Sequence, residues 1–288
     1  WRSADGVTWV QDSISTQVSY PLGIRVLNGT LVVWGSNGGL ARSTDGLAWT
    51  KITSPLPNTS DSITGVVYIN GRYFLTGSDN FSTANRTIYS SVDLVTWSAT
   101  DGTARRSIVS DGSMFMAAAG NVTTTSPDGI NWENTKGYLA YPIAFAQGQF
   151  RAADRNFLYS STDGLSWAES RLPSGVSGLG VYEANGTYLV YGSGKVSIST
   201  DFQNWQSAAF AGGALGSDLL YAFGKYYSVV KSSFSTAIYT SSNGLNWSSF
   251  TSGAAIAFGN GRLVVVNNAS NVFQFQVSTN GTSTTAYS

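Results

Sequence analysis

Cysteine and histidine are both absent from the 288 residues of this chain. Without cysteine there are no disulfides and no thiolate metal site. Without histidine the chain lacks the commonest general base, the commonest ligand of transition metals and any Ser-His catalytic pair. We therefore expect no metal ion and no cofactor, and several large classes of hydrolase are excluded.

Charged side chains are scarce as well. They form 11% of the chain, with 16 basic residues balancing 16 acidic ones, whereas about a quarter of an ordinary domain is charged. The densest basic spot is Arg105-Arg106, so the basic stripe that a nucleic-acid partner requires is missing. No run of 18 apolar residues occurs, and we expect no membrane insertion. The polar surface must come from Ser, Thr, Asn and Gln, a composition typical of exported proteins.

What the chain has is a repeated seven-residue pattern, Ser-x-Asp-Gly-x-x-Trp, which we call the corner motif. Copies span residues 3–9, 43–49, 126–132 and 161–167, degenerate copies end at Trp97, Trp205 and Trp247, and residues 278–281 lack the tryptophan. The seven motif tryptophans are 40, 48, 35, 35, 38 and 42 residues apart. A period near 40 with one tryptophan per unit is typical of a β-propeller. Because the chain opens inside a motif, without a recognisable signal peptide, we expect a mature or excised product.

Folding accounts for each residue type in the corner motif. The aspartate accepts hydrogen bonds from backbone N–H groups of its own turn, and the serine hydroxyl serves the neighbouring strand in the same way. Glycine relieves a positive φ, and the tryptophan packs back over the turn. We therefore assign a structural role to the motif residues Asp5, Trp9, Asp45, Trp49, Asp93, Trp97, Asp128, Trp132, Asp163, Trp167, Asp201, Trp205, Asn243 and Trp247.

The corner motif resembles the Asp-box, also called the bacterial neuraminidase repeat, which is usually written Ser-x-Asp-x-Gly-x-Thr-Trp. The resemblance covers the entire chain, although each copy here is one residue shorter between the aspartate and the tryptophan. It implies a propeller with the motif at the outer edge of each blade, joining the third and fourth strands. Asp-boxes occur in sialidases, other glycosidases, lectin-like modules and non-enzymatic surface proteins, so the resemblance implies a fold and not an activity.

Four short β-rich runs recur in each repeat, and the first two are joined by a turn of the Asn-Gly type, a strong hairpin signal. These turns lie at residues 28–29, 70–71, 111–112, 147–148, 185–186, 223–224 and 260–261. We predict an all-β fold, a single seven-bladed β-propeller of four-stranded antiparallel blades over residues 1–288. The predicted units lie near residues 24–52, 66–98, 108–134, 143–170, 179–207, 219–250 and 255–288, the last completed by residues 1–11.

Closure by the two chain ends would leave no open sheet edge. Residues 273–278 also read as a third strand, which would compete with residues 1–3 for the same place. An eight-bladed ring, or a chain trimmed from a longer one, therefore stays open as an alternative.

Binding residues are expected on the connections from each fourth strand to the next blade. These connections lie near residues 10–23, 52–65, 99–107, 133–142, 169–178, 207–218 and 249–254. Aromatic residues there include Tyr20, Tyr138, Tyr141 and Phe210, which share no equivalent position. That irregularity slightly favours a protein partner over a glycan.

Departures from the repeat mark further candidates for ligand binding. Trp34 and Tyr191 share a second-strand position, where they suit either sugar stacking or packing between blades. Arg151 replaces an apolar second-strand residue, and with Asp154 and Arg155 it indicates either a polar site or an ion pair at a blade surface.

Glu183 is the one glutamate on a predicted first strand, and Arg25 lies on another. A sialidase-like glycoside hydrolase around these two residues is the alternative function. That chemistry requires three arginines for the substrate carboxylate, a tyrosine–glutamate pair and a further acid. The usual Arg-Ile-Pro motif is absent, and Glu133 and Glu169 fall on predicted fourth strands, so we expect no enzyme.

The sequence therefore predicts a non-enzymatic recognition or adhesion module, extracellular or on the cell surface. Its partner would be a glycan or a surface protein, and it would act alone or within a larger extracellular assembly. Glycosylation is a further expectation for an exported protein, at the sequons of Asn28, Asn58, Asn80, Asn85, Asn121, Asn185, Asn246, Asn268 and Asn280.

Overall fold

The structure, a computed structural model, describes most of the chain. The described residues are 2–11, 17–18, 20–78, 87–103, 107–119, 122–135, 144–153, 156–174, 176, 181–192, 194–210, 212, 214–231, 236–269 and 272–287. Regular structure within these ranges consists of β-strands alone. Among them no helix has the length and apolarity needed to cross a lipid bilayer.

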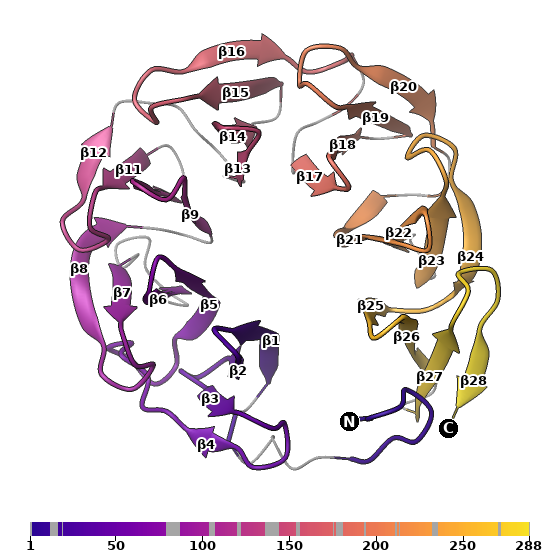
Figure 1. Cartoon of the computed structure of the whole chain (residues 1–288), viewed down its shortest axis with the longest axis horizontal. Helices are drawn as coiled ribbons and strands as arrows, with labels where there is room; N and C mark the ends of the chain where they lie inside the picture. Colours follow the sequence, from indigo (N-terminus) through magenta and orange to yellow (C-terminus); the bar gives the residue numbers. More distant parts are fainter. Residues whose placement is uncertain are drawn as a thin grey trace. The chain divides into compact units, whose positions relative to one another are not determined.

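The strands form seven four-stranded antiparallel sheets arranged as a β-propeller, which confirms the predicted fold class (Figure 1). Each sheet, or blade, uses four strands in chain order. Blades 1 to 3 comprise β1 (Pro21–Leu27), β2 (Thr30–Gly35), β3 (Leu40–Ser43), β4 (Thr50–Lys51); β5 (Ser62–Ile69), β6 (Arg72–Ser78), β7 (Thr87–Ser91), β8 (Ser98–Thr103); and β9 (Ser107–Ser110), β10 (Phe115–Ala119), β11 (Val122–Ser126), β12 (Glu133–Thr135).

The remaining four blades follow the same plan. Blades 4 and 5 comprise β13 (Ala144–Ala146), β14 (Gln149–Ala153), β15 (Phe157–Ser161), β16 (Ala168–Arg171); and β17 (Val181–Ala184), β18 (Thr187–Gly192), β19 (Lys195–Ser199), β20 (Gln206–Ala209). Blades 6 and 7 comprise β21 (Ala214–Ala222), β22 (Lys225–Lys231), β23 (Thr236–Ser241), β24 (Ser248–Ser252); and β25 (Ala255–Gly259), β26 (Arg262–Ala269), β27 (Val272–Ser278), β28 (Thr285–Tyr287).

The chain divides into two compact units. Unit 1 comprises Trp1–Val10, Ala153–Leu158 and Ser170–Ser288, and unit 2 comprises Gln11–Ala152 and Tyr159–Glu169. Within each unit the core lies between adjacent blades. In unit 2, Trp34 and Leu40 of blade 1 pack with Val66 and Leu75 of blade 2, and unit 1 repeats this arrangement between blades 6 and 7.

The turns that join first and second strands have the predicted hairpin geometry. In six of the seven, both turn residues have positive φ, as in Asn28 (φ 49°) and Gly29 (φ 74°), which matches the twist of the flanking strands. The exception is the turn at Asp111, which is longer and is closed by a hydrogen bond from Asp111 N–H to the Met114 carbonyl. Its carboxylate accepts the N–H groups of Ser113 and Met114 at 2.8 Å each.

The corner motif forms a closed network of short-range hydrogen bonds. In the copy at residues 161–167, the Ser161 hydroxyl donates to Asp163 Oδ1 at 2.9 Å and accepts the Gly164 N–H at 2.8 Å. The same Oδ1 accepts the N–H groups of Leu165 and Ser166, at 2.8 Å each. The Trp167 indole N–H donates to the Gly164 carbonyl at 3.2 Å. The contacts of Asp163 are the predicted ones, whereas the Ser161 hydroxyl bonds within its own turn and not to the neighbouring strand.

The degenerate copies keep this geometry with different residues. Asn243 replaces aspartate, and its Oδ1 accepts the Leu245 and Asn246 N–H groups at 3.0 and 2.9 Å. Leu94 and Phe202 stand in the place of glycine, with φ values of 67° and 64°. Both side chains are buried, so packing compensates for the strained backbone.

The last blade differs from the composition expected from the sequence. Its fourth strand is β28, which pairs with β27, and residues 1–11 are not one of its strands. Residues 278–281 lack the tryptophan but keep the turn, because Ser278 Oγ accepts the Gly281 N–H and Asn280 Oδ1 accepts the Thr282 N–H, both at 2.9 Å. The chain therefore turns back at this corner and supplies its own fourth strand.

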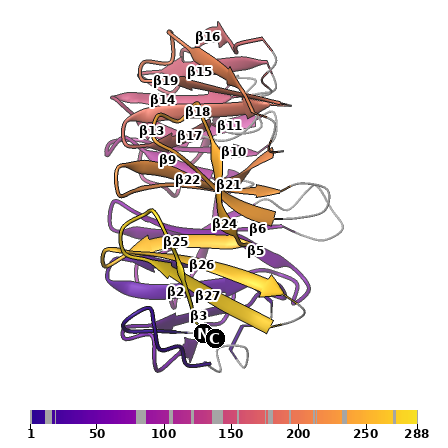
Figure 2. The same cartoon turned by 90° about the vertical axis from the view of Figure 1, so that its right-hand side faces the viewer.

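The N-terminal residues form a separate hairpin in unit 1, bridged between Arg2 and Val10. It lies beside β27 in both views (Figure 1 and Figure 2). A Cβ at Gly6 would meet Arg262 of blade 7. In the same way, the corner Gly281 of blade 7 lies against Tyr227 of blade 6. Each of the seven blades thus has a corner, and an eighth corner lies in the described N-terminal hairpin outside the sheets.

Candidate functional site

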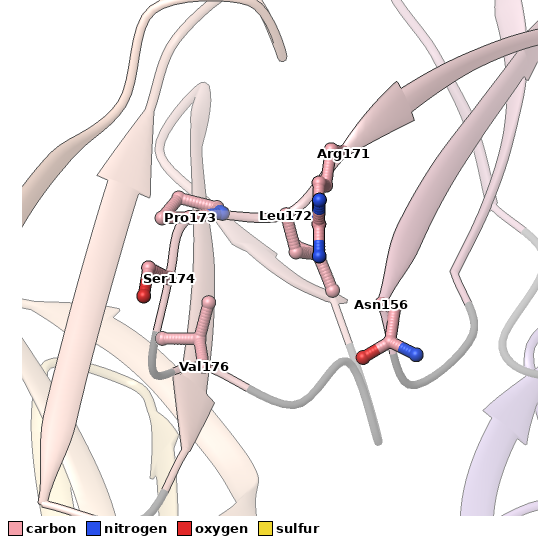
Figure 3. Close-up of a pocket in the computed structure, with 6 residues that line it drawn as sticks. All are labelled: Asn156, Arg171, Leu172, Pro173, Ser174 and Val176. Carbon is pink, nitrogen blue, oxygen red and sulfur yellow. The ribbon is translucent and has the colours of Figure 1, made fainter.

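A pocket of about 480 Å³ lies in unit 1 at the end of β16 (Figure 3). This volume is within the range of small-molecule sites, about 300–1,000 Å³. Four of its lining residues belong to the connection from β16 to β17 and Arg171 ends β16, and all five lie in the predicted binding loop near residues 169–178. The lining residues are Asn156, Arg171, Leu172, Pro173, Ser174 and Val176.

Three hydrogen bonds hold the walls of this pocket in place. The Leu172 N–H donates to the Asn156 carbonyl at 2.8 Å, and the Val176 N–H donates to the Pro173 carbonyl at 3.2 Å. The Lys195 ammonium donates to the Ser174 carbonyl at 2.5 Å. Leu172 and Val176 are buried, so the loop is anchored at two apolar points.

The open side of the pocket is polar. Asn156, Arg171 and Ser174 are exposed, and they contribute an amide, a guanidinium and a hydroxyl to the lining, Arg171 and Asn156 on one side of Leu172 and Ser174 beside Val176 (Figure 3). The Arg171 guanidinium makes no hydrogen bond or ion pair with any residue that the structure describes. The pocket therefore combines an apolar floor with an available cation.

These six residues were not among the candidates predicted from the sequence, although the repeat carries a signal at Arg171. Arg171 stands four positions after a motif tryptophan, a place that carries no other arginine in the chain. The equivalent residues after the other tryptophans from Trp49 onward are Thr53, Asp101, Lys136, Ala209 and Thr251.

Trp34 and Tyr191 are packing residues in this structure, so the exposed pair suited to sugar stacking is not present. The Trp34 side chain is 6% exposed and lies against Gly23. Tyr191 is half-buried, stacks on Tyr182 with ring centroids 5.8 Å apart, and packs against the core of blades 5 and 6. Of the two roles left open by the sequence, packing between blades is the one observed.

The predicted loop aromatics differ in their exposure. Tyr20 is 76% exposed, whereas Phe210 is buried and its ring meets those of Tyr239 and Trp247. Tyr138 and Tyr141 lie outside the described residues. Exposed aromatic rings therefore do not recur at equivalent described loop positions.

Arg151 is buried on β14, paired in register with Ala144. Its expected partners Asp154 and Arg155 lie outside the described residues. A burial of this depth does not suit an open polar site, because the guanidinium is largely withdrawn from solvent.

Glu183 has a structural contact of its own. Its carboxylate accepts the Gly186 N–H at 3.1 Å and so closes the hairpin between β17 and β18. Arg25 is exposed on β1. The two residues belong to different compact units, Glu183 to unit 1 and Arg25 to unit 2.

No group of three His, Cys, Asp or Glu side chains suited to a metal ion occurs among the described residues. The sequon residues Asn28, Asn58, Asn185, Asn246 and Asn280 are exposed. The remaining sequons fall on Asn80, Asn85 and Asn121, outside the described residues, and on Asn268, whose side chain is not described.

No family model matches the chain, and no curated protein does. Solved structures are similar in fold. A GH74 enzyme of Niastella koreensis is 17% identical over 93% of this chain and 43% of that chain, with a TM-score of 0.58. PorZ of Porphyromonas gingivalis, an essential surface component of its type-IX secretion system, is 9% identical over 92% and 39%, with a TM-score of 0.52. Virginiamycin B lyase of Staphylococcus aureus is 12% identical over 87% and 92%, with a TM-score of 0.64.

These similarities show the β-propeller fold. The chain spans about two-fifths of the length of the GH74 enzyme and of PorZ. The similar proteins include enzymes and a surface component, so the shared architecture is compatible with different activities.

Proposed function

We propose that this chain is a non-enzymatic recognition module, extracellular or on the cell surface, that binds a glycan through its propeller loops. The observation that carries this proposal is the pocket at the end of β16. Its volume, apolar floor and polar rim match the requirements of a small polar ligand better than those of a flat protein interface.

The corner motifs support a recognition role rather than catalysis. Asp5, Asp45, Asp93, Asp128 and Asp163 each accept backbone N–H groups of their own turn. Their low pKa values and their structural contacts make them poor general acids. The same holds for Asp201, which accepts the N–H groups of Gln203 and Asn204.

An Asp-box-like propeller of the non-catalytic kind, within a larger extracellular assembly, fits this proposal. The neutral surface, rich in hydroxyl and amide groups, supports an exported location. A surface component such as PorZ has the same fold.

A glycan array with the purified chain, with and without calcium, tests the proposal. Clear binding to one glycan class that free glycan competes away is the expected result. A blank array in both conditions would overturn the glycan ligand and leave a protein partner as the replacement.

The rival glycosidase is tested on a panel of aryl glycosides. We expect no turnover above that of heat-denatured protein. Turnover that Glu183→Gln abolishes would overturn the non-enzymatic assignment, whereas turnover that survives this change would exclude a centre at Glu183. The Glu183→Gln variant keeps an acceptor oxygen for the Gly186 N–H, so the hairpin is expected to remain closed.

A further inference from the structure

We infer that the pocket at the end of β16 binds the carboxylate of an acidic sugar, such as a terminal uronic or sialic acid residue of a glycan. This inference rests on the proposed function and names its ligand class. It assigns the carboxylate to Arg171 and the sugar ring to the apolar wall formed by Leu172, Pro173 and Val176.

The sign of the charge around the pocket favours an anion. Arg171 is the one charged residue among the six that line it, and Lys195 is bonded to the carbonyl of the lining residue Ser174. Glu169 lies two residues before Arg171 on β16, and no ion pair joins the two described side chains. The guanidinium is therefore available to a ligand.

Blade 5 provides an internal comparison for the polar residues of the pocket. There the Phe210 N–H donates to the Gly194 carbonyl at 2.8 Å, as the Leu172 N–H donates to the Asn156 carbonyl in blade 4. Gly194 and Ala209 thus occupy the places of Asn156 and Arg171. Blade 5 makes this backbone hydrogen bond without an amide or a guanidinium side chain. The fold therefore does not require the side chains of Asn156 and Arg171 in blade 4.

The guanidinium has the geometry for a carboxylate. Its planar fork donates two parallel hydrogen bonds to the two oxygens of a carboxylate, which a point charge such as lysine cannot reproduce. Asn156 and Ser174 line the same pocket with an amide and a hydroxyl, and these suit the ring hydroxyl groups of a sugar.

Preorganisation favours binding in a pocket of this kind. Hydrogen bonds from Leu172, Val176 and Lys195 hold the described lining residues 172–174 and 176, so ordering these residues costs little chain entropy when a ligand enters. Pro173 and Val176 lie next to each other in the lining (Figure 3), and their aliphatic surfaces would suit the C–H groups of a sugar ring.

Calorimetric titration with two matched pairs of sugars tests this inference. The probes are sialyllactose against lactose, and a disaccharide ending in glucuronic acid against the same disaccharide ending in glucose. We expect the acidic member of at least one pair to bind about tenfold or more tightly than its neutral counterpart, the usual value of a charge-assisted hydrogen bond.

Substitutions test whether Arg171 causes the preference for the acidic sugar. Arg171→Ala is expected to remove the preference for the acidic sugar, and Arg171→Lys to restore only part of it. Asn156→Gly, which copies blade 5, is expected to weaken both members of a pair. Lys51→Ala, an exposed cation on the fourth strand of blade 1, is the control and should leave binding unchanged.

The two proposals fail in different ways. Equal binding of acidic and neutral sugars, or a preference that Arg171→Ala leaves intact, would overturn the carboxylate site while a glycan-positive array keeps the proposed function. A blank array together with no heat from any of the four sugars would overturn both.

Discussion

The indole of Trp9 lies almost parallel to the ring of Phe275, with ring centroids 3.9 Å apart and an interplanar angle of 9°. This stack attaches the N-terminal hairpin to blade 7. Aromatic pairs contribute about 0.5–1.5 kcal/mol beyond the burial of their area, and we expect Trp9→Ala to lower the free energy of unfolding by about 2 kcal/mol. Urea denaturation followed by circular dichroism measures this change. Val7→Ala, at an exposed residue of the same hairpin, is the control, and equal midpoints for the two variants would contradict the attachment.

Acid should destabilise the chain through its corner aspartates. The backbone N–H groups of Ser166 and Leu165, with the hydroxyl of Ser161, lower the pKa of Asp163 to about 2. A folded pKa below the unfolded value of about 4 stabilises the fold fully above that value, and the contribution is lost as the pH falls through the folded pKa. We therefore expect urea midpoints to hold from about pH 7 to about pH 5 and to fall between about pH 4 and about pH 2.

Corners with asparagine distinguish the effect of protonating the aspartate from the effect of losing the turn's hydrogen bonds. Asn243 accepts the same two N–H groups without a titratable group. Asp163→Asn should therefore keep the fold at neutral pH and reduce the loss of stability in acid, and Asn243→Asp should increase that loss. An acid profile that neither change alters would show that other groups control it.

Phe202 tests the balance between backbone strain and burial. Its φ is 64°, and its ring, 4% exposed, has its centroid 3.8 Å from that of Tyr188. Removing the ring costs about 3–5 kcal/mol and glycine regains about 1–2 kcal/mol of strain, so Phe202→Gly should destabilise the chain by about 1–4 kcal/mol. Phe202→Ala keeps the strain without the ring and should be less stable still. The reverse order of the two variants in a thermal melt would exclude strain at this corner.

Gly23 marks a close approach between a backbone and a side chain. A Cβ there would overlap the Trp34 indole, although the φ of Gly23 is not positive. We expect Gly23→Ala to cost about 1–3 kcal/mol, as overpacking of a core does. Gly259→Ala is the matched control, because its Cβ would enter open space on a strand. Equal unfolding free energies for the two variants would contradict the packing of Trp34.

The parts of the fold that the sequence predicts are those made by neighbouring residues. Asn-Gly turns and corner motifs depend on hydrogen bonds and φ angles within a few positions, so their residue types identify them. Strand β28 has three residues and no motif tryptophan, and only its pairing with β27 makes it a strand. From the sequence, residues 1–11 were therefore predicted to complete blade 7 where β28 does so.

The candidate site was harder to predict for the same reason. Whether Trp34 is exposed depends on Gly23 and on the facing blade, which no local pattern encodes. Arg171 could have been found by aligning the fourth-strand ends, but Asn156 is brought to the pocket by tertiary contacts such as the backbone bond from Leu172. A residue that departs from the repeat, such as Arg171, can be recognised in the sequence. The residues that join it in a pocket, such as Asn156, can be identified only from the tertiary structure.

Each corner hydrogen bond joins residues only two or three positions apart. The copy at residues 3–9 keeps these bonds although it belongs to none of the seven sheets. Closing such short loops is far faster than pairing distant strands, and folding rates of β-rich proteins are limited by the distant pairings. Corners can thus form ahead of the blades, and each of the seven within a blade brings its third and fourth strands together. A chain of this kind begins its search for strand partners from eight turns that are already closed.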